Sequence, residues 1–209
     1  MEPHTEIPET PMQRHPPEAY TELATGIREV LFTAVEIEQR VHALGTTISQ
    51  DYAGRNPLLV GVLRGVYIFM ADLHRAITIN AEVDFMAVSS YSAESRDRGM
   101  VQIIKDLDVS IANRHVIFVE DMIDTGLTLN FLLRTLRVQQ PASLEVCALF
   151  NKARRRLIDI PIKYKGFDVP DRLIVGYGLD YRERFRNLPF VGLLEPSVFQ
   201  NSQSAKNAG

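Results

Sequence analysis

Short, continuous runs of apolar residues, separated by helix-like segments, constrain the fold of this chain most strongly. Three runs stand out, at residues 58–63, 116–119 and 144–150, the last interrupted only by Glu145. A strand that is apolar on both faces is typical of a parallel sheet with helices packed on each side. We therefore predict an α/β protein with a mostly parallel, twisted sheet flanked by helices.

The other predicted elements follow the same alternation. Residues 27–32 are predicted to form a strand, and Thr33 and Glu36 form a capping box that begins a helix, which ends at Gly54. The remaining predictions are helices at residues 67–76 and 127–138 and strands at residues 83–88, 101–105, 173–175 and 190–194.

The composition excludes several classes of protein. A length of 209 residues fits one domain, with or without a small additional lobe. The formal charge of −3 lacks the basic excess of a general nucleic-acid-binding protein. Every apolar run is far shorter than the ~20 residues that span a bilayer, and the N-terminus has no apolar segment typical of a secretion signal. We therefore expect a cytoplasmic protein with no nucleic-acid or membrane partner.

The cysteine and histidine content points the same way. Cys147 is the single cysteine, so no intramolecular disulfide can form, and a reducing compartment is expected. Because Cys147 lies in an apolar strand, we expect a buried, unreactive thiol. The five histidines are scattered without the spacing of metal ligands, so no zinc site is assigned.

The densest group of chemically active side chains follows the strand at residues 116–119. Glu120 and Asp121 are predicted to close this strand, Asp124 comes three residues later, and residues 125–128 open a helix. Free N–H groups at a helix start attract an anion, so this segment is a candidate phosphate site. The adjacent carboxylates can accept hydrogen bonds from sugar hydroxyls or bind Mg²⁺.

The sequence EDMIDTGLT at residues 120–128 resembles the motif that binds 5-phosphoribosyl 1-pyrophosphate (PRPP) in type I phosphoribosyltransferases. In having an aspartate at position 124, the motif resembles that of the hypoxanthine-guanine branch of the family. The resemblance covers about residues 26–196. It implies a phosphoribosyltransferase domain at residues 19–196 and a small hood lobe built from the chain ends. The Pro-rich composition of residues 1–18 predicts a disordered N-terminal tail, and the polar residues 197–209 are predicted to form a C-terminal tail.

Three further segments resemble the same family. Leu63-Arg64-Gly65 is similar to the pyrophosphate loop, in which Arg64 and Gly65 face pyrophosphate and the turn often contains a cis peptide. Ser90 and Tyr91 resemble the pair that begins a mobile lid loop. Lys152 matches a lysine that donates to the purine O6 atom and so disfavours a 6-amino group. The arginines at residues 154–156 are expected to be solvated surface.

The last matching segment, at residues 169–181, resembles the family's purine-binding segment. By this match, Leu173 contacts the face of the base and Ile174 offers backbone groups to its edge, while Asp180 helps to hold Mg²⁺. Arg186 is implied to face pyrophosphate. The family usually has Phe or Tyr at the position of Leu173, and leucine loses ring stacking worth about 1–3 kcal/mol per base, which leaves the preferred purine open.

The resemblance implies a specific reaction in purine salvage. The 5-phosphoribosyl group moves from PRPP to N9 of hypoxanthine or guanine, giving IMP or GMP and pyrophosphate. Asp124 is implied as the catalytic residue, acting as general base or hydrogen-bond acceptor for the purine proton. The residues implied to bind the PRPP ribose and 5′-phosphate are Glu120, Asp121, Asp124, Thr125, Gly126, Leu127 and Thr128. Mg²⁺ is the implied cofactor, with Glu120, Asp121 and Asp180 as ligands, and the family implies a homodimer or homotetramer.

Three alternatives stay open at this point. The first is a phosphoribosyltransferase for xanthine or another base. The second is a non-catalytic regulator on the same fold that senses PRPP or a nucleotide, which the acidic balance and the presence of Asp124 and Lys152 disfavour. The third is a dinucleotide-binding oxidoreductase, and it ranks last because no Gly-x-Gly-x-x-Gly sequence follows a strand.

Overall fold

The computed structural model describes residues 14–90 and 101–198. The chain divides into two compact units. Residues 38–171 form one unit, here called the core unit, and the two chain ends, residues 1–37 and 172–209, form the other, here called the hood unit. A lobe assembled from the chain ends therefore exists, as the sequence predicted.

The core unit is built on a six-stranded sheet with the order β4-β3-β2-β5-β6-β7. Neighbouring strands from β3 to β7 are parallel, and the edge strand β4 is antiparallel to β3. The strands are β2 (Leu58–Leu63), β3 (Glu82–Ser90), β4 (Val101–Lys105), β5 (His115–Ile123), β6 (Ser143–Asn151) and β7 (Tyr164–Asp168). The predicted mostly parallel α/β sheet is confirmed.

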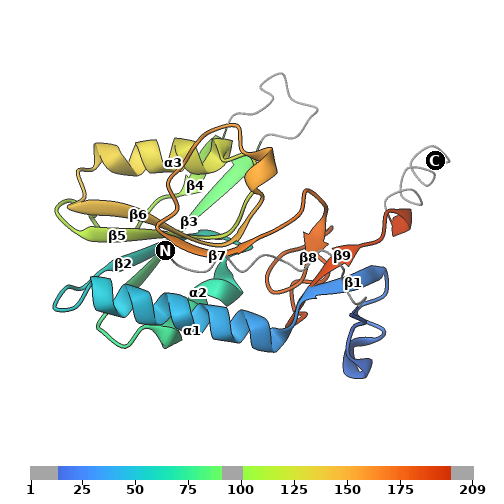
Figure 1. The fold of residues 1–209 in the computed structure, drawn as a ribbon. Coiled ribbons are helices and arrows are strands. Elements are labelled where there is room, and N and C mark those ends of the chain that lie inside the picture. Colours follow the sequence, from blue (N-terminus) through green and yellow to red (C-terminus); the bar gives the residue numbers. More distant parts are fainter. Residues whose placement is uncertain (1–13, 91–100, 199–209) are drawn as a thin grey trace, which may run out of the picture. The chain divides into compact units, whose positions relative to one another are not determined.

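Helices cover both faces of this sheet. Helix α3 (Leu127–Val138) lies on one face, and α1 (Ala34–Asp51) and α2 (Tyr67–Ala76) lie on the other (Figure 1). Four leucines recur at helical spacing along α3 and are buried, namely Leu129, Leu132, Leu133 and Leu136. They pack on the fully buried Val60, Phe118 and Ala148 from β2, β5 and β6, so apolar contact fixes α3 against the strands that precede and follow it.

The hood unit contains a smaller antiparallel sheet. Its strands are β1 (Ile27–Phe32), β9 (Val191–Leu194) and β8 (Ile174–Val175), in that order across the sheet. Val30, Val175 and Phe190 are buried in its core. A short 3₁₀ helix, η1 (Glu18–Tyr20), precedes β1, and Tyr20 meets the Phe190 ring edge-on with centroids 5.8 Å apart.

Several predicted bounds change in the structure. Strand β5 does not end at Val119, because its pairing with β6 continues from Val119 to Ile123 after its pairing with β2 has ended. Glu120 and Asp121 therefore lie within the strand, not at its close. The predicted strands at 173–175 and 190–194 are each one residue shorter at the start, so Leu173 precedes β8.

The sequence analysis missed strand β7 and a second 3₁₀ helix, η2 (Ala153–Arg155). Strand β7 reads Tyr-Lys-Gly-Phe-Asp and has no continuous apolar run, since it is an edge strand with one neighbour, β6. Gly166 is required there, because a Cβ atom at this position would overlap the Leu149 carbonyl of β6. Close backbone approach, not hydrophobic pattern, defines this strand.

The two predicted tails are partly ordered. Arg14 pairs with Glu36 at 2.7 Å, and its carbonyl accepts a hydrogen bond from Val30 N at 2.8 Å. Arg14 therefore has defined partners, and Pro17 O accepts a hydrogen bond from Tyr20 N at 2.9 Å. At the other end, Val198 N donates to Glu195 O at 3.1 Å. The rest of both predicted tails, residues 1–13 and 199–209, lies outside the described residues.

The predicted capping box forms at the start of α1. Thr33 N donates to the Glu36 carboxylate at 2.8 Å, and Glu36 N donates to Thr33 Oγ1 at 3.3 Å. The hydrogen bonds of the box, together with the Arg14 contact, outweigh partial burial and lower the pKa of Glu36. The box fixes where the chain turns from β1 into α1.

Replacing the capping threonine tests this account. Thr33→Ala should lower the free energy of unfolding by about 1 kcal/mol, because an N–H group at the helix start loses its partner. Urea unfolding measures the change. Thr47→Ala is the matched control, since its exposed hydroxyl bonds only to Ala43 O within the same helix. Equal losses in both variants would contradict a specific role for the box.

Candidate active site

A cavity of about 310 Å³ lies where β2 and β5 end in the core unit. The carboxyl ends of parallel strands are where α/β sheets bind ligands. Of the predicted site residues, eight line this cavity: Arg64, Gly65, Glu120, Asp121, Asp124, Thr125, Gly126 and Thr128. The structure thus brings together the segment resembling the pyrophosphate loop and the segment resembling the PRPP motif. Leu127 is not among the lining residues, and its side chain is exposed.

The turn after β2 fits closely against the acidic pair. The peptide between Leu63 and Arg64 is cis, as the resemblance implies. A Cβ atom at Gly65 would overlap the Asp121 carboxylate, so a residue with a side chain would displace that group. Met122 N donates to the same carboxylate at 2.7 Å. Asp121 is therefore held between its own strand and the turn.

Glu120 sits in an unfavourable electrostatic environment. Burial and the neighbouring negative charge of Asp121, in that order, raise the pKa of Glu120 well above its usual range. A bound cation, or hydroxyl groups that donate hydrogen bonds, would reduce the repulsion between the two carboxylates at this cavity wall. Among the described residues, no group of three or more His, Cys, Asp or Glu side chains could hold a metal, so any metal here would need oxygen atoms from a ligand as well.

The start of α3 offers backbone donors to the same cavity. Gly126 precedes the helix with a φ of +82°, a conformation that glycine adopts without strain. The N-cap residue, Gly126, provides no side-chain cap, and Leu127 N donates a long hydrogen bond, of 3.4 Å, to Thr125 Oγ1. The uncapped N–H groups and the Thr125 and Thr128 hydroxyls therefore form an anion-binding arrangement.

Asp124 has a partner that the sequence analysis did not predict. Arg155 Nε lies 2.9 Å from Asp124 Oδ1. The N–H bond is not directed at this oxygen, which is buried and accepts no hydrogen bond from a described residue. The Asp124 side chain as a whole is 40% exposed. The contact is thus an ion pair that covers one carboxylate oxygen.

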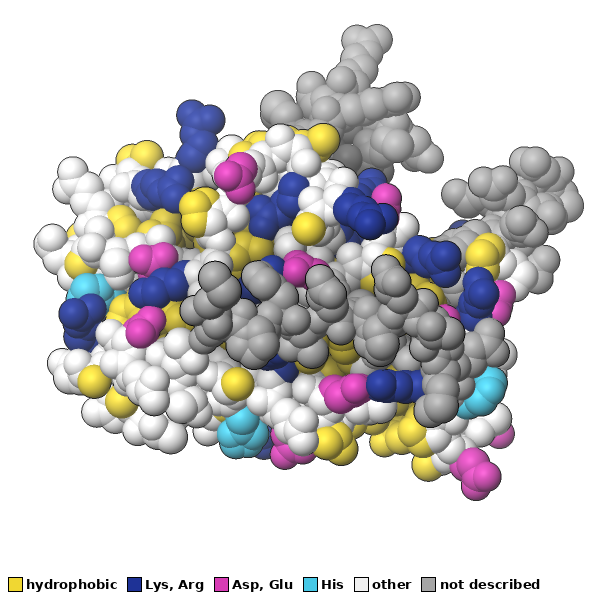
Figure 2. Space-filling model, in the orientation of Figure 1, with side chains coloured by type: hydrophobic (Ala, Val, Ile, Leu, Met, Phe, Trp, Pro, Cys, Tyr) yellow, Lys and Arg dark blue, Asp and Glu magenta, His cyan; other side chains and the backbone are white. Residues whose placement is uncertain are grey.

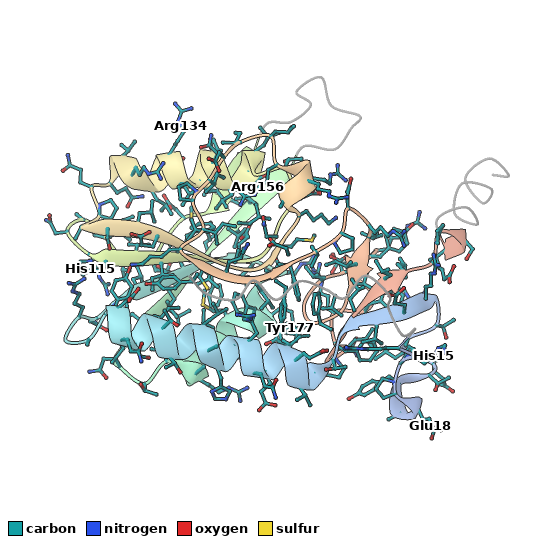
Figure 3. The ribbon with its side chains drawn as sticks, in the orientation of Figure 1. His15, Glu18, His115, Arg134, Arg156 and Tyr177 are labelled. Carbon is teal, nitrogen blue, oxygen red and sulfur yellow. The ribbon has the colours of Figure 1, made fainter. Side chains whose placement is uncertain are left out.

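Of the three arginines predicted to be solvated surface, Arg154 and Arg155 are exposed, as predicted, although Arg155 also pairs with Asp124; the prediction is wrong for Arg156, which is half-buried. Arg156, labelled in Figure 3, donates from Nε to Asn151 Oδ1 at 3.1 Å and from Nη1 to Ile160 O at 3.2 Å. Three consecutive arginines carry no sequence signal that separates them, because their roles depend on the turn of η2.

Lys152 follows β6 and is buried, with 4% of its surface exposed. Its backbone N–H donates to Ile123 O at 2.9 Å, which ties it to the end of β5. The preceding Asn151 donates from its side chain to Asp168 Oδ1 at 2.6 Å. The ammonium group of Lys152 pairs with no carboxylate in the described part of the chain, so this buried cation is available to an acceptor on a ligand.

Four predicted site residues belong to the hood unit. Asp180 and Arg186 pair with each other at 2.7 Å, and Arg186 also donates to Gly178 O at 2.7 Å. Arg186 Nε is buried and has no acceptor among the described residues. Ile174 is buried in β8, and Leu173 packs against the hood core. Asp180 is thus in a different unit from Glu120 and Asp121.

The predicted lid pair is only partly described. Ser90 ends β3, where its backbone pairs with Val101. Tyr91 lies outside the described residues.

Two further observations bear on the alternatives. Lys and Arg side chains of the described residues are interspersed with Asp and Glu on the face shown in Figure 2, and Arg134 lies on the exposed side of α3 (Figure 3). The described residues on that face form no broad basic area of the kind that a nucleic-acid-binding protein presents. Within residues 14–90 and 101–198, none of the helices has the length and apolar character needed to cross a bilayer.

Cys147 behaves as predicted. It is fully buried in β6, and burial raises the pKa of its thiol. A buried thiol with a raised pKa is a poor nucleophile.

A parallel sheet with two carboxylates and a helix start at one strand edge is an arrangement suited to an anionic sugar derivative. Comparison with known proteins makes the class specific. The family model described as "Phosphoribosyl transferase domain" matches residues 30–182. The chain therefore belongs to the phosphoribosyltransferase family.

The relatives named hypoxanthine-guanine phosphoribosyltransferase place it further. The protein of that name from Streptococcus mutans is 46% identical over 177 residues, covering 85% of this chain and 98% of the relative. The one from Bacillus subtilis is 44% identical over 175 residues, covering 84% and 97%. A crystal structure of a hypoxanthine phosphoribosyltransferase from Staphylococcus aureus superposes with a TM-score of 0.81 at 43% identity, covering 85% and 97%. The chain is an enzyme of this pentosyltransferase group.

The raised pKa of Glu120 generates a stability prediction for the metal-free protein. A carboxyl whose pKa rises on folding stabilises the folded state below its unfolded pKa, and this contribution is lost as pH rises through the folded pKa. Glu120→Gln removes the ionisation. The variant should therefore melt at a higher temperature than the parent at pH 8 in EDTA, and the gain should shrink as pH falls toward 4.5. Thermal unfolding across this range tests it, and a gain that is constant with pH would contradict it.

Proposed function

We propose that this enzyme transfers the 5-phosphoribosyl group of PRPP to N9 of hypoxanthine or guanine, producing IMP or GMP and pyrophosphate. One observation carries the proposal. The acidic pair of β5, the uncapped start of α3 and the turn at residues 63–65 line one cavity. PRPP carries two hydroxyls, a 5′-phosphate and a pyrophosphate, and the cavity presents one matching group of side chains or N–H groups for each.

The helix start is assigned to the 5′-phosphate. The N–H groups at residues 126–128 and the hydroxyls of Thr125 and Thr128 can donate to phosphate oxygens. Glu120 and Asp121 then accept hydrogen bonds from the ribose 2′- and 3′-hydroxyls. Arg64 and the backbone at Gly65 face the pyrophosphate, and Arg186 contributes a further cation, consistent with its unpartnered Nε atom.

Mg²⁺ fits the donor set at the acidic pair. Mg²⁺ in proteins is held by one or two carboxylates together with oxygen atoms of phosphate ligands. Glu120 and Asp121 would supply the carboxylates; the family resemblance adds Asp180, which in this structure belongs to the hood unit and pairs with Arg186. When bound, the ion supplies positive charge to the departing pyrophosphate.

The base is recognised by Lys152 and oriented by Asp124. The buried ammonium of Lys152 donates to a 6-oxo group and would face a 6-amino group without an acceptor, which costs binding energy. Asp124 lines the cavity and accepts the purine proton, or a hydrogen bond from it, as the bond to N9 forms. Leu173 and Ile174 are assigned to the base face and edge, and Ser90 and Tyr91 to a lid that excludes water.

A preference for xanthine is the second candidate, because Leu173 does not decide between the purines. Leu173 packs within the hood core by apolar contact and offers no aromatic ring to the base. Loss of stacking weakens all purines and leaves the choice between them to polar contacts at the base edge. The mechanism is the same for this substrate, and only the preferred base differs.

The function is tested by following nucleotide formation from PRPP, Mg²⁺ and each of four bases: hypoxanthine, guanine, xanthine and adenine. We expect turnover of hypoxanthine or guanine and none of adenine, because adenine cannot accept from Lys152. Turnover of xanthine alone would move the base preference to the second candidate. Saturable PRPP binding with no turnover of any base would overturn the enzyme proposal and favour a PRPP-sensing regulator.

The role of Asp124 gives a second prediction. Asp124→Asn keeps the shape of the side chain but removes the charge and the basic oxygen. We expect kcat with hypoxanthine to fall by about 100-fold, while KM for PRPP changes less than threefold. Full turnover in this variant would exclude Asp124 as the base.

The proposal also includes a cytoplasmic homodimer or homotetramer. Sedimentation equilibrium of the full chain distinguishes these assemblies from a monomer of 23.6 kDa.

A further inference from the structure

The segment after β6 is fastened to the loop that carries Asp124. Lys152 N donates to Ile123 O at 2.9 Å, and Leu157 N donates to Thr125 O at 3.0 Å. These two backbone hydrogen bonds flank Asp124, which follows β5, in one segment and the η2 turn, which follows β6, in the other. The backbones that carry Asp124 and Lys152 are therefore fixed relative to each other, before any side chain is considered.

Arg155 lies between these two hydrogen bonds and reaches across to the aspartate. Its Nε atom is 2.9 Å from Asp124 Oδ1, and its Nη1 atom is 3.4 Å from Asp171 Oδ1. Its own N–H donates to Lys152 O at 2.9 Å. The guanidinium thus has two carboxylate partners, and the backbone of Arg155 is held separately by Lys152.

The consequence for Asp124 follows from its two oxygens. The Oδ1 atom is buried beside Arg155, whereas the side chain as a whole is 40% exposed. The exposed acceptor is therefore Oδ2. A carboxylate that is free to rotate about its Cβ–Cγ bond presents either oxygen, but a guanidinium on one oxygen breaks this symmetry and leaves the other for a ligand.

We propose that Arg155 is a positioning residue for the reaction, which holds Oδ1 of Asp124 so that Oδ2 faces the purine. This inference rests on the proposed function, because it assigns Asp124 to the base. Arg155 touches no reacting atom and acts through Asp124 alone. Arg155 lies in the turn that follows Lys152. It therefore links the orientation of Asp124, the proposed general base, to the segment that binds the 6-oxo group.

A double-mutant cycle tests this role. Arg155→Ala should lower kcat with hypoxanthine about tenfold, and KM for PRPP should change less than twofold. In the Asp124→Asn background the same substitution should change kcat by less than twofold, because a residue that acts through Asp124 has nothing left to orient. Arg155→Lys should restore part of the loss, since an ammonium can still pair with the carboxylate.

The neighbouring Arg154 provides the matched control. Arg154 directly precedes Arg155 and its side chain is exposed. Arg154→Ala removes the same charge as Arg155→Ala, and should leave kcat within twofold in both backgrounds. Melting temperatures of the two alanine variants should agree closely, because the ion pair of Arg155 is partly exposed and contributes little to stability.

Each outcome separates the two claims. An equal loss on Arg155→Ala in both backgrounds, or no loss in either, with the unsubstituted enzyme active, would overturn the positioning role and leave the function intact. Absence of nucleotide formation by the unsubstituted chain with all four bases would overturn the proposed function, and the positioning role with it.

Discussion

The unequal pairing of β5 with its two neighbours is the constraint on which the rest of the site depends. Pairing with β2 ends at Val119, while pairing with β6 continues to Ile123. The chain therefore carries Glu120 and Asp121 past its last pairing with β2 in extended conformation before α3 begins at Leu127. Two carboxylates and a helix start reach the same cavity because β5 continues past this pairing and the buried leucines of α3 fold the helix back onto the sheet.

Within one short segment, one side of the cavity disfavours negative charge and the other side attracts it. Burial next to Asp121 makes ionisation of Glu120 costly, while the uncapped N–H groups of α3 attract negative charge. A ligand with hydroxyls at one end and phosphate at the other satisfies both. Gly65 lies close against Asp121, so the turn after β2 packs directly on the acidic pair of the cavity wall.

Much of this was predictable from the sequence, for physical reasons that differ between elements. Strands β2 and β5 are apolar on both faces, which predicts a parallel sheet. The leucines of α3 recur at helical spacing, which predicts a helix with one buried face. Strand β7 gave no such signal, because its place depends on Gly166 lying against the Leu149 carbonyl. The extension of β5 depends on the length of β6, and the ion pair of Arg155 with Asp124 depends on the turn of η2. These features arise from contacts between distant segments, which local patterns do not encode. The roles of the hood residues Leu173, Ile174, Asp180 and Arg186 stay predictions.

The central claim is that the start of α3 holds the 5′-phosphate and the acidic pair holds the ribose. A crystal structure of the full chain with IMP and Mg²⁺ tests it most directly. The account predicts the phosphate within hydrogen-bond distance of the N–H groups at residues 126–128, with the ribose hydroxyls at Glu120 and Asp121. A nucleotide bound with its phosphate away from the start of α3, or with its ribose away from these two carboxylates, would contradict it.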